Sequence, residues 1–325
     1  MQFRTPINIT PSSWRITHRS GGFAVGSCFA EHISDRLAQL KYHITSNPLG
    51  PMYNPHSIAR CIERISSGQA FVHEELCEWR GRWFSTEAHT LLAADTAEKA
   101  LKRLNAALAT AHQALTSADY VILTLGTNRV YEQNGRVVAN CHRLPAEQFT
   151  RRSMGVEEIT SVLSEVFERE LAGKRIILTV SPIRHLKDGL SENALSKASL
   201  RVAAAELAAR HAERVSYFPA YEIMMDDLRD YRFYAADMVH PSEQAVNYVW
   251  ELFGESHLDP SEHELNRRIE RLVKACGHRP LDASGAEYHT FLERTAEECR
   301  TLATTYPEVD FGREMDFLRD SLTKK

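Results

Sequence analysis

The 325-residue sequence lacks several features that would place it in a specialised class of protein. It contains no run of about 18 consecutive apolar residues, so we expect no transmembrane helix and no membrane partner. No apolar segment typical of a signal peptide opens it, and its six cysteines include no CxxC pair. We therefore expect a reduced, cytoplasmic protein without a disulfide framework or a zinc site.

The sequence also lacks a large charge of either sign. It holds 39 Lys and Arg against 43 Asp and Glu, which gives a formal net charge of −4 with histidine neutral. A weakly acidic chain has no global attraction for nucleic acid or anionic lipid, so neither is predicted as a partner. Hydrophobic residues make up 43% of the chain and charged residues 25%, an ordinary globular composition that excludes a disordered or collagen-like chain.

Short apolar runs alternate with helical patterns along most of the chain. The runs are nearly continuous in apolar character, as in strands that are covered on both faces. They lie at residues 22–25, 120–125, 175–180 and 215–218, with a weaker candidate at 42–46. Apolar residues at helical spacing fill the intervals. This βαβα succession predicts an α/β fold with a central parallel sheet and helices on both faces.

The pattern changes near residue 254. No strand-like run follows, and the segment SEHELNRRIERLVKA is charged and helical in its spacing. We predict one α/β domain over residues 1–254 and a helical C-terminal extension over residues 255–325.

Ligands of open α/β sheets bind beyond the carboxyl ends of the strands, so polar residues at those ends are the first candidates for a site. Ser27 follows the first run, where a helix begins. Free backbone N–H groups and the helix macrodipole favour a nucleophile there, although an N-cap or a weak anion-binding loop also fits. The Cys28 thiol is a rival nucleophile. Adjacent residues of the turn point in different directions, and we favour Ser27.

Two other strand ends carry candidate residues. Asn128 follows the run at 120–125, where its amide fits either an oxyanion hole or an ordinary turn. Asp237 and His240 stand three residues apart before the last α/β helix. The carboxylate of such a pair can orient the ring, which then takes a proton from a serine; a solvated Asp and a capping His are the alternative. The spacing also suits a metal, but no second cluster completes a metal site.

The order of these elements resembles the layout of the SGNH (GDSL-type) hydrolase superfamily. The string GSCFAEHI at 26–33, with NPLGPMYNPHSIA downstream, resembles the GSCFA-domain family within it. The resemblance runs over roughly residues 3–253 and includes CHRLP at 141–145 and SPIRH at 181–185. It implies a flavodoxin-like, three-layer α/β/α fold.

The resemblance also implies roles for individual residues. Ser27 matches the nucleophile, His240 the general base, and Asp237 the partner of that histidine. Asn128 matches the side-chain donor of the oxyanion hole, which the backbone N–H groups of Ser27 and Gly50 would complete. The acidic residue that usually precedes the serine in the superfamily is absent from this sequence.

Basic residues at predicted strand ends suggest how a substrate is held. Arg129 stands where the superfamily usually has an Asp; its planar fork fits a carboxylate or phosphate of the substrate, or a carboxylate of the protein itself. The predicted substrate-binding residues are Arg129, His142, Arg184 and His185. Such a cationic pocket would suit a hydroxylated or anionic substrate, for example a sugar ester. Lys197, on a following helix, is expected to be solvated.

These observations together predict a serine-dependent hydrolase of short-chain or carbohydrate O-acyl esters that works through an acyl-enzyme, without metal or organic cofactor. Three alternatives remain open. They are an O-acyltransferase with the same triad, a catalytically silent binding module, and a phosphate- or nucleotide-binding protein. The last is disfavoured because no Gly-rich loop follows the first run.

Overall fold

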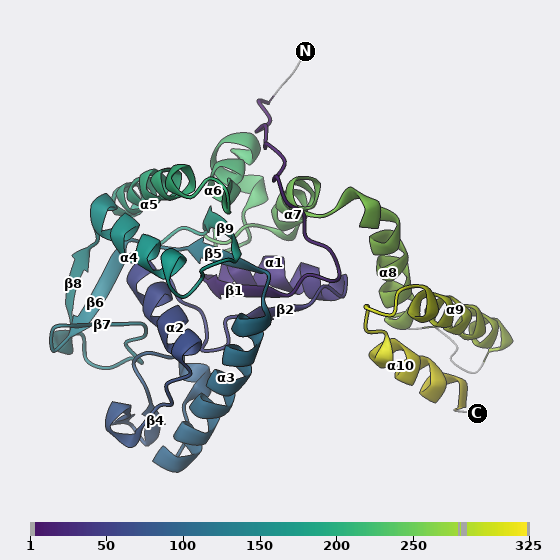
Figure 1. Cartoon of the computed structure of the whole chain (residues 1–325), viewed down its shortest axis with the longest axis horizontal. Coiled ribbons are helices and arrows are strands. Elements are labelled where there is room, and N and C mark those ends of the chain that lie inside the picture. Colours follow the sequence, from purple (N-terminus) through teal and green to yellow (C-terminus); the bar gives the residue numbers. More distant parts are fainter. Residues whose placement is uncertain (1–3, 279, 281–284, 324–325) are drawn as a thin grey trace.

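The computed structural model describes residues 4–278, 280 and 285–323. Its centre is a five-stranded parallel sheet (Figure 1). The strands, in spatial order, are β10 (Val215–Phe218), β9 (Arg175–Val180), β5 (Tyr120–Leu125), β1 (Gly22–Gly26) and β2 (Ile44–Ser46). Each of the apolar runs predicted to be a strand forms one, and the weak candidate at residues 42–46 contains β2. The prediction of an α/β fold with a central parallel sheet is confirmed.

Helices cover both faces of this sheet because successive strand residues point to opposite sides. Val121 and Leu123 of β5 belong to one apolar core, whereas Tyr120 and Ile122 belong to the other. The first core is closed by α2 (Pro55–Ser67), α3 (Ala97–Ser117), α4 (Val156–Glu168) and α5 (Leu190–Arg210). The second core includes α1 (Cys28–Gln39), α6 (Ala220–Glu222) and α7 (Glu243–His257). The layers are therefore helix, sheet and helix.

Two small antiparallel sheets lie outside this frame. One pairs β3 (Cys77–Trp79) with β4 (Arg82–Phe84). The other has the order β7-β6-β8, from β6 (Arg129–Gln133), β7 (Arg136–Val138) and β8 (Thr150–Ser153). The turn between β6 and β7 is Asn134-Gly135, and both residues have positive φ (52° and 74°), as the tightest hairpin turns require. This second sheet directly follows β5 and becomes a wall of the candidate site.

Short helical turns make up the other regular elements. A π-helical segment, η4 (Ile223–Leu228), follows α6 directly. The 3₁₀ turns are η1 (His73–Glu75), η2 (Thr90–Leu92), η3 (Ala146–Gln148), η5 (Tyr231–Phe233) and η6 (Pro260–Glu262). Among the helices of the described residues, none is long and apolar enough to cross a membrane.

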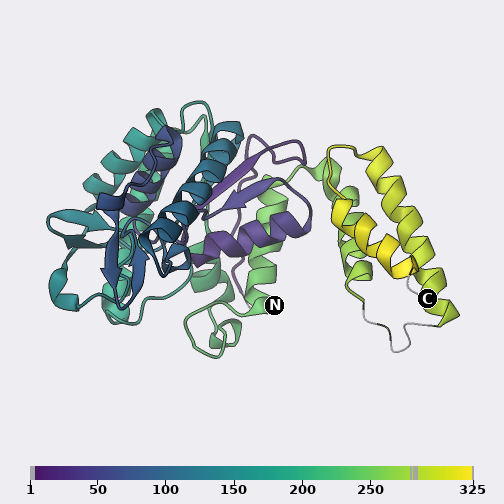
Figure 2. The same cartoon turned by 90° about the horizontal axis from the view of Figure 1, so that it is seen from below.

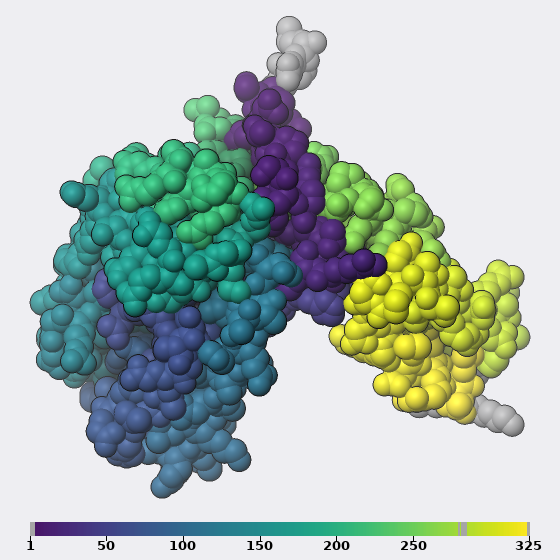
Figure 3. All heavy atoms as spheres, viewed as in Figure 1, coloured from purple at the N-terminus to yellow at the C-terminus, as the bar shows by residue number. Residues whose placement is uncertain are grey.

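Three helices follow α7 and form a separate lobe (Figure 2). They are α8 (His263–Cys276), α9 (Ala286–Thr305) and α10 (Gly312–Thr323). After β10, the described part of the chain forms no further strand. The space-filling view places the segment that precedes β1, drawn in purple, between this lobe and the larger one (Figure 3).

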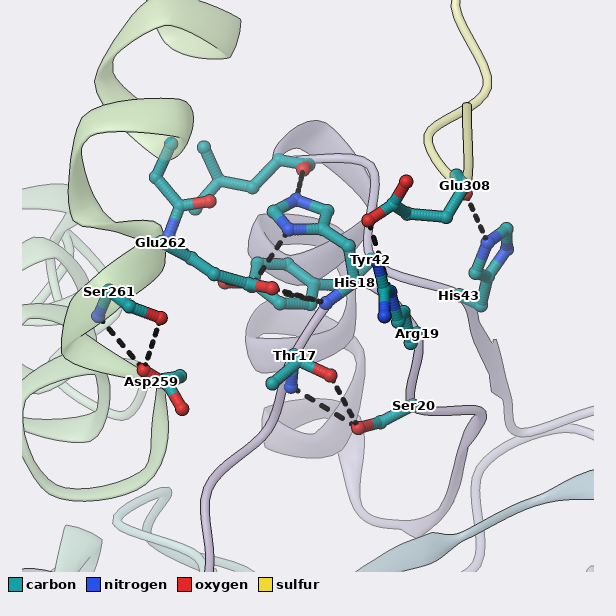
Figure 4. A network of polar contacts seen from close by, with 12 residues as sticks. Thr17, His18, Arg19, Ser20, Tyr42, His43, Asp259, Ser261, Glu262 and Glu308 are labelled. Carbon is teal, nitrogen blue, oxygen red and sulfur yellow. Dashed lines mark hydrogen bonds and ion pairs between the residues drawn. The ribbon is translucent and has the colours of Figure 1, made fainter. Parts of the chain in front are cut away.

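A buried polar network joins that N-terminal segment to the start of the helical lobe (Figure 4). His18 is 1% exposed, and its Nδ1 lies 2.8 Å from the Glu262 carboxylate while its Nε2 lies 2.8 Å from the Leu40 carbonyl oxygen. The imidazole stacks on Tyr42 with 4.0 Å between ring centroids. Tyr42 in turn donates to Glu262 and accepts from Asn266. His18 therefore connects both lobes through side-chain and backbone partners.

We expect His18→Phe to lower the free energy of unfolding by about 1–3 kcal/mol, because it keeps a ring on Tyr42 but removes the polar contacts to the buried Leu40 carbonyl and to the partly buried Glu262 carboxylate. Urea denaturation followed by tryptophan fluorescence measures the loss. The matched control is His43→Phe, since His43 is exposed and also bonds a backbone oxygen of the helical lobe, that of Glu308. The control should stay within about 0.5 kcal/mol of the wild type. Equal losses in the two variants would contradict the importance of the network.

Candidate functional site

A cavity of about 490 Å³ opens at the carboxyl edge of the parallel sheet. Ser27, Thr127 and Ser181 line it, and each follows directly or closely on a strand, namely β1, β5 and β9. β1 and β5 are neighbours at the point where the strand order reverses, since the chain first adds β2 on one side and later β5 on the other. In open α/β sheets this is where ligands bind.

Ser27 combines two features that the sequence analysis treated as alternatives, a helix N-cap and a place at the candidate site. It is the N-cap of α1, with its Oγ accepting the Phe29 N–H at 3.4 Å, and it also lines the cavity. Its own N–H donates to the Thr124 carbonyl at 3.1 Å and so extends the β1–β5 ladder by one residue. That N–H is consequently engaged, and the expectation that it completes an oxyanion hole is not met in this structure.

Asp237 and His240 form a tightly bonded pair. Asp237 Oδ2 lies 2.6 Å from His240 Nδ1, and Asp237 Oδ1 accepts the N–H groups of Val239 and His240 at 2.9 and 3.0 Å. These bonds, led by the His240 N–H, lower the pKa of Asp237 to about 2. The carboxylate stays ionised at neutral pH and orients the ring through Nδ1. Nε2 bonds no described residue, and the ring lines the same cavity as Ser27.

The serine and the histidine line the same cavity without a hydrogen bond between them. Ser27 Oγ has no hydrogen bond to His240; its bonded partner is the Phe29 N–H. The His240 and Asp237 side chains are 44% and 50% exposed, so little packing opposes a movement of the pair toward Ser27. In unliganded enzymes the hydrogen bond between nucleophile and base is often long and tightens with substrate.

Gly50 does not line the cavity. Its N–H donates to the Asn47 carbonyl at 2.7 Å, and it is absent from the cavity lining. Its φ is +89°, and a Cβ at this position would overlap the Cβ of His89. The glycine is needed for a tight turn and a close approach of two segments, which replaces the oxyanion role expected from the sequence.

Asn128 is also directed away from the cavity lining. Its Nδ2 donates to the Met154 carbonyl at 2.9 Å, and its own carbonyl accepts the Met154 N–H at 2.8 Å. The residue is 5% exposed. This reciprocal pair joins the residue before β6 to the residue after β8 and so extends the pairing of these two strands. The predicted oxyanion donor is therefore held in a structural contact.

Asn54 is a cavity residue that the sequence analysis missed. It is the N-cap of α2, where its Oδ1 accepts the Ser57 N–H at 2.8 Å and Pro55 follows at the first helical position. Its Nδ2 has no hydrogen-bond partner among the described residues, and Asn54 lines the cavity beside Ser27. The signal was present in the sequence as an Asn-Pro pair at a helix start.

Three of the four predicted substrate-binding residues line the cavity. Arg129 is paired with Glu192 and Ser153, so its charge is partly neutralised by the protein. The Arg184 guanidinium lies 4.1 Å from the centre of the Tyr234 ring and 5.2 Å from that of Tyr231. The third, His185, places Nε2 3.1 Å from the Gly126 carbonyl oxygen.

His142 is the exception, because it is buried outside the cavity lining. Its ring stacks on Phe84 at 4.0 Å, with Nδ1 3.1 Å from Thr90 Oγ1 and Nε2 2.9 Å from the Ser85 carbonyl oxygen. Burial lowers the pKa of His142. A satisfied histidine of this kind supports packing between loops and does not contact a substrate in the cavity.

Lys197 was expected to be solvated, and this was wrong. It is 1% exposed, and its Nζ donates to the carbonyl oxygens of Gly126 and Ser181, each at 2.7 Å. Gly126 and Ser181 directly follow β5 and β9, and Ser181 lines the cavity. Burial lowers the pKa of Lys197 to about 7. A lysine on a helix gives no local sign that its face will be covered.

The sequence of the chain matches known family models in both of its lobes. A sequence model described as the GSCFA family matches residues 23–253, which include all of the parallel sheet except its first residue, Gly22, and every residue that lines the cavity. The chain belongs to the GSCFA family. A second model, described as the C-terminal domain of GSCFA domain proteins, matches residues 269–324 in the helical lobe of this family member. No curated protein matches the chain. The described residues contain no group of three or more potential metal ligands.

The contacts of Asn128 predict a structural effect of its replacement. Asn128→Ala should lower the free energy of unfolding by about 1–3 kcal/mol, because the buried Met154 carbonyl loses its side-chain donor. Chemical denaturation checks this. Gln133→Ala, which removes an exposed amide bond to Gln148, is the control and should change stability by no more than about 0.5 kcal/mol. An Asn128→Ala protein as stable as the control would contradict the assignment.

Proposed function

We propose that this GSCFA protein is a serine-dependent ester hydrolase of the SGNH type, with Ser27 as nucleophile, His240 as general base and Asp237 as the residue that orients the base. The observation that carries the proposal is the 2.6 Å Asp237–His240 pair, whose ring lines the same cavity as a serine at the N-terminus of α1. An ionised carboxylate on Nδ1 stabilises the imidazolium that forms when Nε2 takes a proton.

The strand order supports the superfamily assignment. Numbered along the chain, the five parallel strands have the order 2-1-3-4-5, which is that of flavodoxin-like sheets. The candidate nucleophile follows the first strand and the Asp-His pair precedes the last helix of the sheet domain, as in the SGNH layout. Together they favour an SGNH hydrolase over an unrelated α/β protein.

The proposed reaction has two steps. His240 Nε2 takes the hydroxyl proton as Ser27 Oγ attacks the ester carbonyl; the tetrahedral adduct then expels the alcohol, which receives that proton from the imidazolium. A water deprotonated by the same ring next attacks the acyl-serine, and collapse of the second adduct releases the acid and restores the Ser27 hydroxyl. Because both side chains are exposed, the Asp237–His240 pair can move toward Ser27 as one unit without disturbing a packed core.

Two donors suit the oxyanion better than those expected from the sequence. Asn54 offers an Nδ2 that bonds no described residue, while its Oδ1 keeps the residue fixed as the cap of α2. Cys28 is the first residue of α1, so its N–H lacks an acceptor within the helix, and it lines the cavity next to Ser27. We propose that these groups replace Gly50 and Asn128 in stabilising the developing charge.

The cavity favours a small, hydroxylated ester. Its volume of about 490 Å³ fits a sugar ring with a short acyl group better than a long chain. The charges near it are partly compensated, since Arg129 pairs with Glu192 and Asp188 pairs with Arg151. The lining combines apolar side chains, among them Ile183, Leu186 and Val239, with polar groups of partly neutralised charge. Such a mixed lining supports short-chain or carbohydrate O-acyl esters as substrates.

The nucleophile is tested with a fluorophosphonate probe and with 4-nitrophenyl acetate. Ser27→Ala should abolish labelling and lower turnover by about 10⁴-fold or more, while losing about 1 kcal/mol of stability as an N-cap. Cys28→Ala is the neighbouring control and should keep labelling. Labelling that survives in Ser27→Ala, or disappears in Cys28→Ala, would contradict the proposal. Acyl transfer to an added sugar, measured by product analysis, would instead assign the same triad to a transferase.

The oxyanion donor is tested with Asn54→Ser. Serine also caps helices, so the melting temperature should change little, whereas loss of the amide should lower kcat by about 10²–10³-fold. Asn54→Asp, which keeps the cap and adds a negative charge, should be at least as slow. An unchanged kcat in both variants would remove Asn54 from the mechanism.

A further inference from the structure

The carbonyl of Gly126, beside the proposed nucleophile, accepts hydrogen bonds from two side chains. Its oxygen accepts from Lys197 Nζ at 2.7 Å and from His185 Nε2 at 3.1 Å, while the Gly126 N–H donates to the Tyr53 carbonyl at 2.8 Å. A Cβ at Gly126 would lie only 3.4 Å from Ser27 Cβ. The peptide that ends β5 is therefore fixed on both sides and contacts the wall of the cavity next to Ser27.

This arrangement determines the tautomer of His185. A carbonyl oxygen only accepts hydrogen bonds, so Nε2 must carry the hydrogen that faces Gly126. The main chain is held as well, since the His185 N–H donates to Asn193 Oδ1 at 3.0 Å. Nδ1 bonds no described residue, and the ring lines the cavity. In a neutral ring Nδ1 carries a lone pair that is available to a ligand.

The surroundings keep this ring neutral. Lys197, fully buried, brings an ammonium group to the same oxygen, and no carboxylate bonds either Lys197 or His185 within the described residues. The charged groups that act on His185 are Lys197 from α5 and Asp188, whose carboxylate is paired with Arg151. Burial, and then the Lys197 charge, lowers the pKa of His185.

We propose that His185 is a neutral hydrogen-bond acceptor in the cavity, that Lys197 is the positioning residue that holds it so through the Gly126 carbonyl, and that Nδ1 recognises a hydroxyl group of the substrate. The hydroxyl recognition rests on the proposed esterase function, whereas the state of His185 does not. A lone pair at this position attracts a hydroxyl and repels a carboxylate or phosphate. His185 thus selects for a polyol or sugar ester, which replaces its expected role as a cationic substrate ligand.

The state of His185 is measured directly by long-range ¹H–¹⁵N spectra of protein labelled with ¹⁵N-histidine. His185→Gln identifies the signal, which at pH 7 should be that of a neutral ring protonated at Nε2. An imidazolium, or a ring protonated at Nδ1, would overturn the proposal. The spectrum of the wild-type protein decides this point once the signal is assigned, so the result does not depend on how any lysine variant folds.

The role of Lys197 is tested by the same spectra in Lys197→Met. Removing the cation should raise the pH midpoint of His185 protonation. The matched control is Lys174→Met, because Lys174 also donates to two backbone carbonyls, those of Thr116 and Ala118, beside the opposite end of β5. The control should leave the midpoint unchanged. Equal midpoints in wild type and a folded Lys197→Met would refute the positioning role.

Hydroxyl recognition is tested with two acetate esters, methyl 6-O-acetylglucopyranoside and cyclohexylmethyl acetate. His185→Phe should raise KM for the sugar ester by about tenfold and leave that of the carbocyclic ester nearly unchanged, because only the sugar donates to Nδ1. His185→Gln, which keeps a polar side chain, should recover part of the loss. Equal effects on both esters would refute recognition by His185. If neither ester is hydrolysed and no probe labels Ser27, the esterase proposal fails, while the spectra still decide the state of His185.

Discussion

The parallel pairing of β1 with β5 is the constraint on which the site depends. The ladder runs from Gly22 opposite Tyr120 to Gly26 opposite Thr124, and the Ser27 N–H adds one more bond to Thr124. A side chain at Gly26 would overlap the Thr124 backbone, so the strands approach as closely as they do only because that residue is glycine. Ser27 is thereby fixed at the cavity edge, with its side chain against Gly126.

A second requirement arises where parallel strands end. Carbonyl groups at their carboxyl ends leave the sheet and need donors if they are buried. Lys197 supplies two such bonds, to Gly126 and Ser181, from a helix on one face of the sheet. A buried ammonium without a carboxylate partner is costly, and the pKa of Lys197 near 7 reflects this cost. Lys197 thus satisfies two carbonyls at the strand ends without a carboxylate partner beside them.

The main sheet could be predicted from the sequence because four of its five strands are local apolar runs, and only β2 (Ile44–Ser46) gave a weak signal. The sheet of β6, β7 and β8 could not be predicted in this way, since its strands are short and polar, although Asn134-Gly135 is a recognisable hairpin turn. The Asp237–His240 contact also followed from spacing, because three residues suffice to close one turn. These features depend on residues close together in the chain.

The positions of the oxyanion donors and of His142 could not be predicted from the sequence, because they depend on contacts between segments that are distant in the chain. Gly50 and Asn54 lie four residues apart in one motif, yet His89 packs on the first and the cavity opens at the second. Asn128 bonds Met154, and His142 bonds Ser85 and Thr90. In each case the partner lies more than 20 residues away, in a segment whose path the local pattern does not specify.

The two halves of the proposed triad differ in how firmly they are held. Ser27 is fixed by the strand ladder and by its place as the cap of α1. His240 belongs to an exposed loop that is held by its own hydrogen bonds. The Asp237 carboxylate bonds the His240 N–H and Nδ1, and the Ala235 N–H donates to the His240 carbonyl. The absence of a Ser27–His240 bond is then consistent with catalysis, because the loop can move while the Asp237 contact persists. A bound substrate that excludes water would favour a hydrogen bond between Ser27 and His240. The fixed position of Ser27 would then determine the position that His240 has to reach.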